Sequence, residues 1–455
     1  MQLPEDFVRG TRQLMGETRF NSYLEAFEKE APVSIRMNLK KSLELRVESL
    51  ESATALPDAQ SSAAAANSPL STLNSQLNPV PWCAEGYYLE GRPQFTFDPL
   101  FHAGCYYVQE AASMFVTHVI KWIMENGQWK METPLQMLDL CAAPGGKSTA
   151  MLSVLPEDCT LVSNEPIPTR AQILLENITK WGAKNCIVTN NYPRDFKKAK
   201  AKFDLILCDV PCSGEGMFRK DPATISEWSV QNVEKCWRLQ REIVADAWEC
   251  LNPGGIMIYS TCTFNTKENE ENVRWIMEEY DAEVIDIPID PSWHITGSLL
   301  DGFEAPVYRF IPGITRSEGL FVCVLRKRGE WREARGKRND LRQLKCLSID
   351  GMQELSTLRS AEGRLLPTGR KNSQLSTPTA DLPYSEALKY LRGEAIVLPA
   401  DAPRGIVTVT YKGFALGPVK NIGNRANNLY PKPWRIKTTH LPTEPVEIVK
   451  LKIKL

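Results

Sequence analysis

The sequence of 455 residues lacks several features that mark specialised classes of protein. No stretch approaches ~18 uninterrupted apolar residues, so we expect no transmembrane helix and no membrane partner. The first thirty residues show no basic segment followed by an apolar one, so we expect no export signal. Twelve cysteines form no CxxC pair and only four histidines are present, which argues against a metal site and a disulfide framework. These absences predict a protein of the reducing cytoplasm.

The sequence also lacks a strong net charge and any internal repeat. Lys and Arg number 54 and Asp and Glu number 55, which excludes a uniformly basic coat but not a local basic face. Hydrophobic residues make up 43% and charged residues 24%, which excludes collagenous, disordered and coiled-coil chains. At roughly 100–200 residues per domain, the length predicts two to four domains. Nothing indicates an obligate oligomer, so we expect a monomer.

From residue 130 onward, short apolar runs alternate with helical segments. This alternation predicts right-handed βαβ crossovers and a mostly parallel sheet. The expected strands are 136–140, 159–165, 186–191, 203–211, 255–264, 283–288 and 319–328, and the main expected helices are 168–182, 230–251 and 266–280.

Changes in composition divide the chain into three parts. Residues 1–125 form an N-terminal extension that begins with a helical stretch and contains an Ala-, Ser-, Asn- and Pro-rich insertion at 51–79. Residues 126–329 carry the alternating pattern, and residues 330–455 form a basic linker and a smaller domain. The many aromatic residues between 82 and 107 fit either core packing, which we favour, or a surface on which bases stack.

A glycine-bearing loop, DLCAAPGGKS (139–148), follows the first expected strand and opens a helix. Gly145 and Gly146 permit a tight turn and close approach to a ligand, and free amides at a helix start favour a carboxylate or phosphate. Glu165 ends the next strand, where a carboxylate can accept hydrogen bonds from ribose hydroxyls. The loop is neither GxGxxG nor GxxxxGK[ST], which leaves a nucleoside such as S-adenosylmethionine. By its chemistry alone, the loop fits a purely structural turn equally well.

Two further strands deliver reactive side chains to the same edge of the expected sheet. Asp209 and Cys212 follow the fourth strand, and Cys262 follows the fifth. A free cysteine is usually a small buried hydrophobe, as we expect for Cys208 and Cys323. Cys262 lies past its apolar run, where a thiolate could meet a substrate.

These motifs together resemble the RNA 5-methylcytosine methyltransferases of the Nop/Sun type. The matching segments are SIRMN (34–38), YYVQEAASM (106–114), LDLCAAPGGKS (138–148), DVPCSGEGMFRKDP (209–222), YSTCTFNTKENE (259–270) and EGLFVCVLRK (318–327). The tail, 413–436, is similar to the extra C-terminal domain of the bacterial branch that acts on small-subunit (16S) ribosomal RNA.

The resemblance implies an α/β fold with a Rossmann-like seven-stranded methyltransferase sheet whose final strand is antiparallel. It implies an N-terminal helical extension and a smaller C-terminal α+β domain, both binding RNA. It also implies that Cys262 is the nucleophile and that Cys212 assists release of the product. The residues implied around S-adenosylmethionine are Cys141, Ala142, Ala143, Pro144, Gly145, Gly146, Lys147, Glu165 and Asp209.

One position departs from the family pattern. The family has an Asp after the third strand to hold the adenine, whereas this sequence reads NNYPRD (190–195). An Asn amide can meet the adenine edge, so Asn191 is the candidate for this contact.

The expected chemistry follows from the weak nucleophilicity of cytosine C5. A Cys262 thiolate that adds to C6 would activate C5 toward the sulfonium methyl group. Asp209 would bond the N3/N4 edge of cytosine and supply a proton. Lys147 would support this electrostatic arrangement, or would be only a surface lysine at a helix start.

RNA binding requires surfaces outside the sheet, because the target base must leave its stack. Residues 326–345 hold nine Lys and Arg against three acids, and residues 420–437 hold five with no acid. Tyr430 and Trp434 in the second segment are candidates for stacking. Each segment could also be a solvated charged face, more readily in the case of 326–345.

The leading hypothesis is therefore an S-adenosylmethionine-dependent enzyme that forms 5-methylcytosine in ribosomal RNA. The same chemistry on transfer RNA is an alternative, as is a non-catalytic RNA-binding or ribosome-assembly factor on this scaffold. A dinucleotide-dependent oxidoreductase is disfavoured by the missing GxGxxG and by the paired cysteine motifs.

Overall fold

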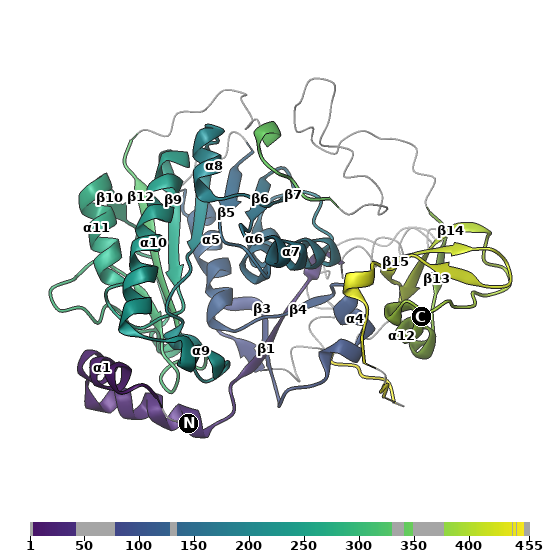
Figure 1. Cartoon of the computed structure of the whole chain (residues 1–455), viewed down its shortest axis with the longest axis horizontal. Helices are drawn as coiled ribbons and strands as arrows, with labels where there is room; N and C mark the ends of the chain where they lie inside the picture. The colour runs from purple at the N-terminus through teal and green to yellow at the C-terminus, as the bar shows by residue number, and fades with distance from the viewer. Residues whose placement is uncertain are drawn as a thin grey trace, which may run out of the picture.

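The computed structural model describes residues 3–41, 78–127, 134–329, 341–348, 377–438, 440–442 and 444–449. The expected insertion at 51–79 lies outside these ranges except for its last two residues, and so do residues 330–340 of the basic segment. The described chain forms three sheets, which are arranged along the length of the molecule (Figure 1). None of the described helices has both the length and the apolar character needed to cross a bilayer.

The largest sheet holds eight strands in the order β10-β12-β9-β8-β5-β6-β7, with β11 paired to β12 off this path. The strands are β5 (Gln136–Asp139), β6 (Thr160–Asn164), β7 (Cys186–Thr189), β8 (Phe203–Asp209), β9 (Leu251–Thr261), β10 (Ala282–Val284), β11 (Tyr308–Phe310) and β12 (Leu320–Lys327). Strands β7, β6, β5, β8 and β9 run parallel, whereas β12 is antiparallel to β9. The predicted seven-strand path with an antiparallel final strand is confirmed, and the short β11 is an addition to it.

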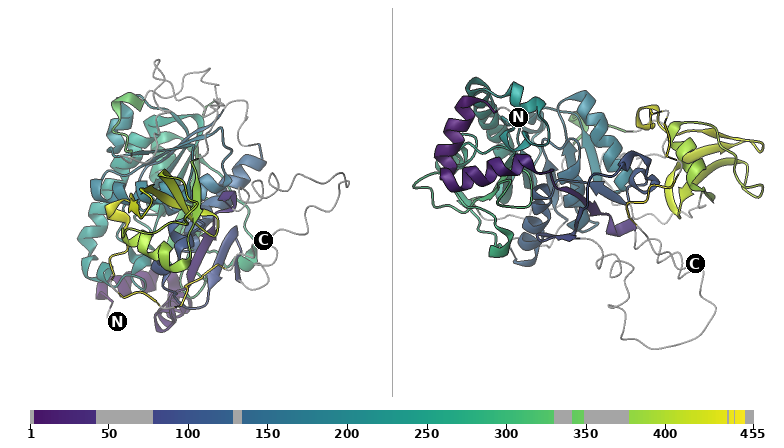
Figure 2. Two further views of the ribbon diagram at one scale, coloured as in Figure 1. Left: turned by 90° about the vertical axis from the view of Figure 1, so that its right-hand side faces the viewer. Right: turned by 90° about the horizontal axis from the view of Figure 1, so that it is seen from below.

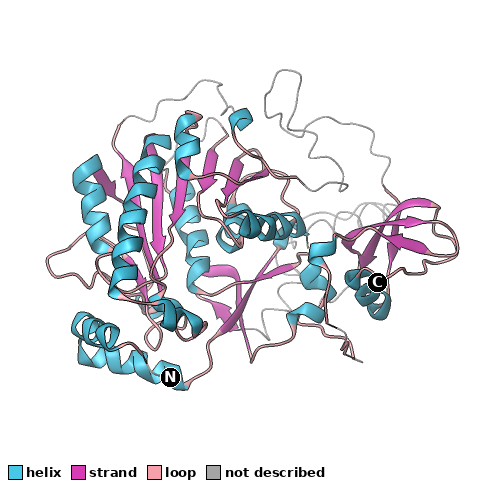
Figure 3. Ribbon diagram, in the orientation of Figure 1, coloured by secondary structure: helices cyan, strands magenta, loops and turns pink. Residues whose placement is uncertain are grey.

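Helices cover both faces of this sheet (Figure 3). Successive side chains of a strand point to opposite faces, so Met137 and Leu161 pack with α5, α6 and α7, while Leu138 and Val162 pack with α8, α10 and α11. The helices are α5 (Phe115–Glu125), α6 (Gly146–Val154), α7 (Pro168–Trp181), α8 (Pro193–Lys198), α9 (Ala223–Glu227), α10 (Val230–Cys250) and α11 (Glu270–Tyr280). The two apolar layers hold the parallel strands in register and leave their carboxyl ends free to build a site.

The N-terminal part combines a helix with a sheet that the sequence did not predict. Helix α1 (Glu5–Glu25) is followed by β1 (Val33–Met37), which holds the SIRM part of the SIRMN motif. The sheet order is β2-β3-β1-β4, with β2 (Asn78–Val80), β3 (Cys83–Leu89) and β4 (Tyr106–Val108). The favoured interpretation of the aromatic segment is confirmed at Trp82, Tyr87, Tyr88 and Tyr106, all of which are buried.

The C-terminal part is an α+β unit at one end of the molecule (Figure 2). It consists of β13 (Thr379–Asp381), α12 (Tyr384–Arg392), β14 (Gly405–Tyr411), β15 (Phe414–Asn421) and β16 (Ala426–Asn428). Its apolar side chains share one core with the N-terminal sheet and with α4 (Pro99–His102). The buried Asp98 carboxylate ties the two parts together, since it accepts hydrogen bonds from the Tyr106 hydroxyl (2.8 Å) and the Ile448 amide (3.2 Å).

A buried ion pair links α11 to β11. Arg309 and Glu270 have side chains that are 1% and 0% exposed, and Arg309 Nε donates to Glu270 Oε1 at 2.7 Å. Arg309 Nη1 also donates to the Phe264 carbonyl at 2.8 Å, just beyond the end of β9. This pair therefore fixes the chain that follows Cys262.

We expect Glu270→Gln to lower the free energy of unfolding by about 3–5 kcal/mol, because it leaves the Arg309 charge buried without a counter-charge. Urea unfolding of the full chain measures the effect. The matched control is Asp281→Asn at the other end of α11, where the pair with Arg328 spans 3.5 Å between side chains 77% and 64% exposed. That substitution should cost less than about 1 kcal/mol, and equal losses in the two variants would contradict the importance of burial.

Candidate active site

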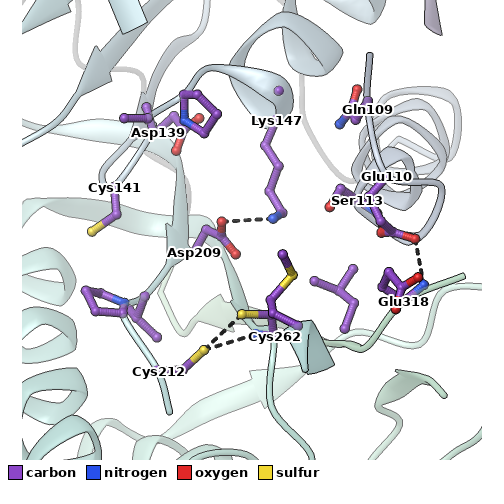
Figure 4. A pocket seen from close by; sticks show the side chains of 18 of the residues that line it. Gln109, Glu110, Ser113, Asp139, Cys141, Lys147, Asp209, Cys212, Cys262 and Glu318 are labelled. Atoms are coloured by element: carbon purple, nitrogen blue, oxygen red, sulfur yellow. Dashed lines mark hydrogen bonds and ion pairs between the residues drawn. The ribbon is translucent and has the colours of Figure 1, made fainter. Parts of the chain in front are cut away.

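A cavity of about 450 Å³ lies at the carboxyl edge of the central sheet. Asp139 at the end of β5, Asp209 at the end of β8 and Cys262 after β9 all line it. The start of α6 and the segment after β4 close its other side. Figure 4 shows these side chains converging on one space from segments far apart in the sequence. The structure confirms the predicted clustering of the two cysteines, Asp209 and the glycine loop.

The two cysteines after β8 and β9 are in direct contact. The Sγ atoms of Cys212 and Cys262 are 3.3 Å apart, and the Cys262 amide also donates to Cys212 Sγ at 3.3 Å. The hydrogen bond with Cys262 and burial raise the pKa of the Cys212 thiol well above its ordinary value. Cys212 is therefore held as a thiol that faces Cys262. By contrast, Cys208 and Cys323 are fully buried in the core, as predicted.

Glu215, three residues after Cys212, holds the chain that follows Cys262. Its Oε2 accepts hydrogen bonds from the amides of Phe264 (2.8 Å) and Asn265 (2.9 Å). Its Oε1 accepts from Trp228 Nε1 at 3.0 Å. The side chain is buried, so all of these bonds are shielded from water.

Glu268, six residues after Cys262, holds the chain that follows Cys212. Its Oε2 accepts hydrogen bonds from the Ser213 amide (3.0 Å) and Gln240 Nε2 (2.7 Å), and its Oε1 accepts from Asn265 Nδ2 (2.8 Å). Burial raises the pKa of Glu268, and the hydrogen bonds from Ser213 and Asn265 act against this rise. Each cysteine loop thus supplies the carboxylate that fixes the other, and we call Glu215 and Glu268 the crossed carboxylates.

The backbones of the cysteine loops also pack tightly against the start of β12. The Gly216 amide donates to the Cys262 carbonyl at 2.9 Å. A Cβ on Gly216 would lie 2.6 Å from the Gly319 Cα and 2.9 Å from the Cys262 carbonyl oxygen. Only glycine fits at these two positions, which explains the glycines of the SGEG and EGLF segments.

An ion pair spans the cavity between α6 and β8. Lys147 Nζ is 2.8 Å from Asp209 Oδ2, and Asp209 Oδ1 accepts from the Ser260 hydroxyl at 2.7 Å. Burial lowers the pKa of Lys147, but the charge and hydrogen bond of Asp209 outweigh it, so the pKa is raised overall. Lys147 is therefore a partly buried cation that lines the site rather than a free surface lysine.

The glycine loop and the ends of β5 and β6 carry groups that fit a nucleoside with an amino-acid arm. Asp139 Oδ2 accepts from the Ser148 hydroxyl at 2.6 Å, while its Oδ1 has no hydrogen-bond partner in the described structure. Burial raises the pKa of Asp139 to about 7. Glu165 is not among the residues that line the cavity. Its Oε2 is likewise buried without a hydrogen bond in the described structure, and it forms a 3.5 Å ion pair with Arg170, which does line the cavity. Buried acceptors without donors suit ribose hydroxyls and an ammonium group.

Most of the remaining predicted residues of the glycine loop line the cavity. Cys141, Ala142, Ala143, Pro144 and Gly146 line the cavity. Gly145 precedes α6 with a φ of 111°, a conformation that favours glycine. Gly145 itself is not among the lining residues.

Asn191 departs from its expected role. Its side-chain amide is used at both ends by the backbone of Lys345, since Nδ2 donates to the Lys345 carbonyl at 3.2 Å and Oδ1 accepts from the Lys345 amide at 3.0 Å. Asn191 also does not line the cavity. The structure therefore speaks against a contact between Asn191 and the adenine, because the segment 341–348 occupies its amide.

Several residues that line the cavity lie within the family motifs but were not among the predicted site residues. Glu110 Oε1 accepts from the Glu318 amide at 2.9 Å, and Glu110 Oε2 accepts from the Ser113 amide at 3.0 Å. These bonds join the N-terminal part to the start of β12. Gln109 and Asp139 were missed as well, although both lie within the quoted motifs YYVQEAASM and LDLCAAPGGKS.

The aromatic side chains of the tail differ in their accessibility. Tyr430 is only 2% exposed and packs between Tyr390 and Trp434, so the prediction that it stacks on a base is wrong. Trp434 is partly buried, and Lys180 Nζ of α7 lies 5.6 Å from its ring centre. Lys420, Arg425, Lys432 and Lys437 of the same segment are exposed.

Three family models match the chain in sequence order. The model of the N-terminal domain of 16S rRNA methyltransferase RsmF matches residues 59–111. The model described as 16S rRNA methyltransferase RsmB/F matches residues 129–326, which include the central sheet. The model of the methyltransferase RsmF PUA domain matches residues 377–436.

Two curated relatives match over nearly their whole length, and a third matches over about half of its length. The ribosomal RNA small subunit methyltransferase F of Enterobacter sp. (strain 638) is 30% identical over 94% of this chain and 95% of its own. The protein of the same name from Citrobacter koseri is 30% identical over 94% and 96%, respectively. The one from Pectobacterium atrosepticum is 37% identical over 56% of this chain and 52% of its own.

Solved structures agree with the fold. A methyltransferase homolog protein from Pyrococcus horikoshii is 25% identical, with a TM-score of 0.55 over 71% of this chain and 95% of its own. NSun6 from the same organism is 20% identical, with a TM-score of 0.53 over 72% and 99%. The chain therefore belongs to the 16S rRNA methyltransferase RsmB/F family and is an S-adenosylmethionine-dependent RNA methyltransferase.

Proposed function

We propose that this enzyme forms 5-methylcytosine in small-subunit ribosomal RNA through a covalent bond between Cys262 and cytosine C6. The observation that carries this proposal is the pair of cysteine sulfurs, 3.3 Å apart, in a cavity that also holds the Lys147–Asp209 ion pair. The names of the curated relatives that match along their whole length support the ribosomal substrate.

Cys262 is the better nucleophile of the two cysteines. Cys212 is kept protonated by its raised pKa and can donate its hydrogen to the Cys262 sulfur. Addition of the Cys262 sulfur to C6 makes C5 electron-rich. Bound S-adenosylmethionine supplies the methyl group that C5 takes.

Asp209 and Lys147 act on the opposite edge of the base. Asp209 bonds the N3/N4 edge. As negative charge develops on the ring, it passes to N3 a proton that comes from the Lys147 ammonium group, 2.8 Å away, and that returns by the same route when the product leaves. Lys147, a partly buried cation, also fixes the Asp209 carboxylate beside the base, because its Nζ lies 2.8 Å from Asp209 Oδ2.

Release of the product requires cleavage of the bond between Cys262 and C6. The proton on C5 leaves, the double bond between C5 and C6 returns and the sulfur is expelled. Cys212 lies in contact with Cys262 and, as a thiol, can protonate the departing sulfur. The thiolate that this leaves on Cys212 takes the C5 proton and so restores the thiol.

The RNA-binding parts lie on the same chain as the cavity. The exposed basic side chains of the 420–437 segment suit contacts to phosphate, which would make affinity fall with salt. A ribosomal substrate would place this activity in the cytoplasm.

We expect Cys262→Ala to abolish methyl transfer and Cys212→Ala to accumulate a covalent protein–RNA adduct, because the first variant lacks the nucleophile and the second lacks the group that assists release. Tritiated methyl incorporation measures the first effect. Denaturing gel electrophoresis with radiolabelled RNA detects the second.

The double variant should form no adduct, and Cys323→Ala, in the core, should behave as the parent enzyme in both assays. Full turnover by Cys262→Ala would refute covalent catalysis. Absence of an adduct from Cys212→Ala would remove its role in release.

We expect Glu268→Gln to lower kcat roughly ten- to hundredfold, while the Kd for S-adenosylmethionine stays within about twofold. The glutamine amide has one acceptor fewer for the chain after Cys212, and a small displacement of a catalytic side chain is costly in catalysis. Single-turnover kinetics and isothermal titration separate the two quantities. Glu234→Gln, which changes a partly exposed side chain paired with Lys267, serves as the control. A loss confined to cofactor affinity would show that Glu268 does not act on the cysteines.

We expect loss of the gene to remove methylation from at least one cytosine of 16S ribosomal RNA and from no cytosine of transfer RNA. Bisulfite sequencing of both RNA classes from a deletion strain, with and without a plasmid copy, gives the answer. A site that disappears only from transfer RNA would favour the alternative substrate. Unchanged maps in both classes would favour a non-catalytic assembly factor.

A further inference from the structure

The side chain of Gln109 has an unused donor that lines the cavity. Gln109 follows β4, is 5% exposed, and has an Nε2 atom with no hydrogen-bond partner in the part of the chain that the structure describes. Its Oε1 accepts from Arg36 Nε at 2.9 Å. An amide NH₂ buried without a partner is costly, so it points to a ligand that supplies an acceptor.

Arg36 fixes which end of the Gln109 amide faces the cavity. A guanidinium group can only donate, so the amide oxygen must face Arg36 and the NH₂ group must face away from it. Arg36 also donates to the hydroxyls of Thr149 (2.6 Å) and Ser153 (3.1 Å), and it lies over the Trp181 ring at 4.5 Å. The orientation of Gln109 is therefore locked before any ligand arrives.

Arg36 is a buried cation without a carboxylate partner in the described ranges. It is fully buried, and its hydrogen bonds to Gln109, Ser153 and Thr149 all go to neutral oxygens. Burial lowers its pKa to about 10, so it remains charged at neutral pH. A buried positive charge of this kind favours an anion nearby.

The free amide of Gln109 lies beside the N-terminus of α6. A Cβ on Gly146, the first residue of α6, would lie 3.6 Å from Gln109 Nε2. The nine-residue helix α6 has no side-chain cap at this end, and its first amides point out of the helix with the positive end of its dipole. Three sources of positive potential thus meet at one wall of the cavity.

We propose that Gln109 Nε2 and the N-terminus of α6 bind the carboxylate of S-adenosylmethionine, with Arg36 as the positioning residue that orients Gln109. Figure 4 shows Gln109 at the end of the cavity away from the two cysteines and Gln109 nitrogen turned toward the interior. The amino-acid arm of the cofactor can occupy that end while its methyl group lies near the base. A backbone phosphate of RNA carries the same chemistry, but it would approach from the side of the cysteines.

Gln109→Glu tests this subsite with little risk to the fold, because the carboxylate keeps the acceptor for Arg36 and adds an ion pair. It replaces the NH₂ donor by an oxygen that repels a carboxylate. We expect the Kd for S-adenosylmethionine to rise roughly ten- to hundredfold. The Kd for decarboxylated S-adenosylmethionine, which lacks only the carboxylate, should stay within about twofold or fall. Isothermal titration measures both, and Tm should equal or exceed that of the parent.

Gln231→Glu, at an exposed position of α10, makes the same chemical change away from the cavity and should alter neither Kd. Equal weakening of both ligands in Gln109→Glu would overturn the proposal, because the lost contact would then not involve the carboxylate. An unchanged Kd for S-adenosylmethionine with a raised KM for RNA would also overturn it, and would assign the donor to a phosphate instead.

Discussion

The reactive end of the molecule depends on the crossed carboxylates, Glu215 and Glu268. Each is buried and accepts hydrogen bonds from backbone amides of the loop that carries the other cysteine. Burying two carboxylates is costly unless their oxygens are fully bonded. Here the carboxylates accept hydrogen bonds from loop amides that would otherwise have no partner. These bonds offset the desolvation cost of the carboxylates and at the same time fix the positions of the two cysteine loops. The contact between Cys212 and Cys262 is a consequence of this arrangement and not of the sheet alone.

The cavity is otherwise poorly arranged for stability, which is typical of a binding site. Asp139 has one oxygen without a partner, and burial raises its pKa to about 7. Because the pKa in the folded state lies above the unfolded value, the stabilising contribution of this group is full below the unfolded pKa and is lost as the pH rises toward 7. At neutral pH the folded protein therefore carries a carboxyl group that is poorly solvated. A cationic ligand such as a sulfonium or ammonium group stabilises the poorly solvated Asp139 carboxylate. The free energy that this carboxylate costs the unbound enzyme is thereby recovered on binding and increases the affinity for the ligand.

The sequence predicted the central sheet well because its signals are local. The alternating runs appear in the structure as expected, and the helix expected at 168–182 is α7, which begins at Pro168 and ends before Gly182. The N-terminal sheet was missed because β1 pairs with β3 and β4, which lie beyond an intervening segment of the chain. The burial of Tyr430 and the contact of Asn191 with Lys345 also depend on distant segments. Local patterns cannot show such pairings, although the motifs that hold Gln109 and Asp139 marked the right places.

The shared core between the N-terminal and C-terminal parts decides how RNA can be presented to the cavity. The Ile448 amide is held by Asp98, and the Trp434 ring lies near Lys180 of α7, so the C-terminal part contacts both the N-terminal sheet and a helix of the central sheet. Burial raises the pKa of Asp98 to about 6, yet the hydroxyl and amide bonds that it accepts keep it placed between the two parts. A basic surface attached in this way is a fixed distance from the cysteines. Selection of one cytosine can then arise from the shape of the folded RNA that reaches both places at once, without hydrogen bonds to the flanking bases.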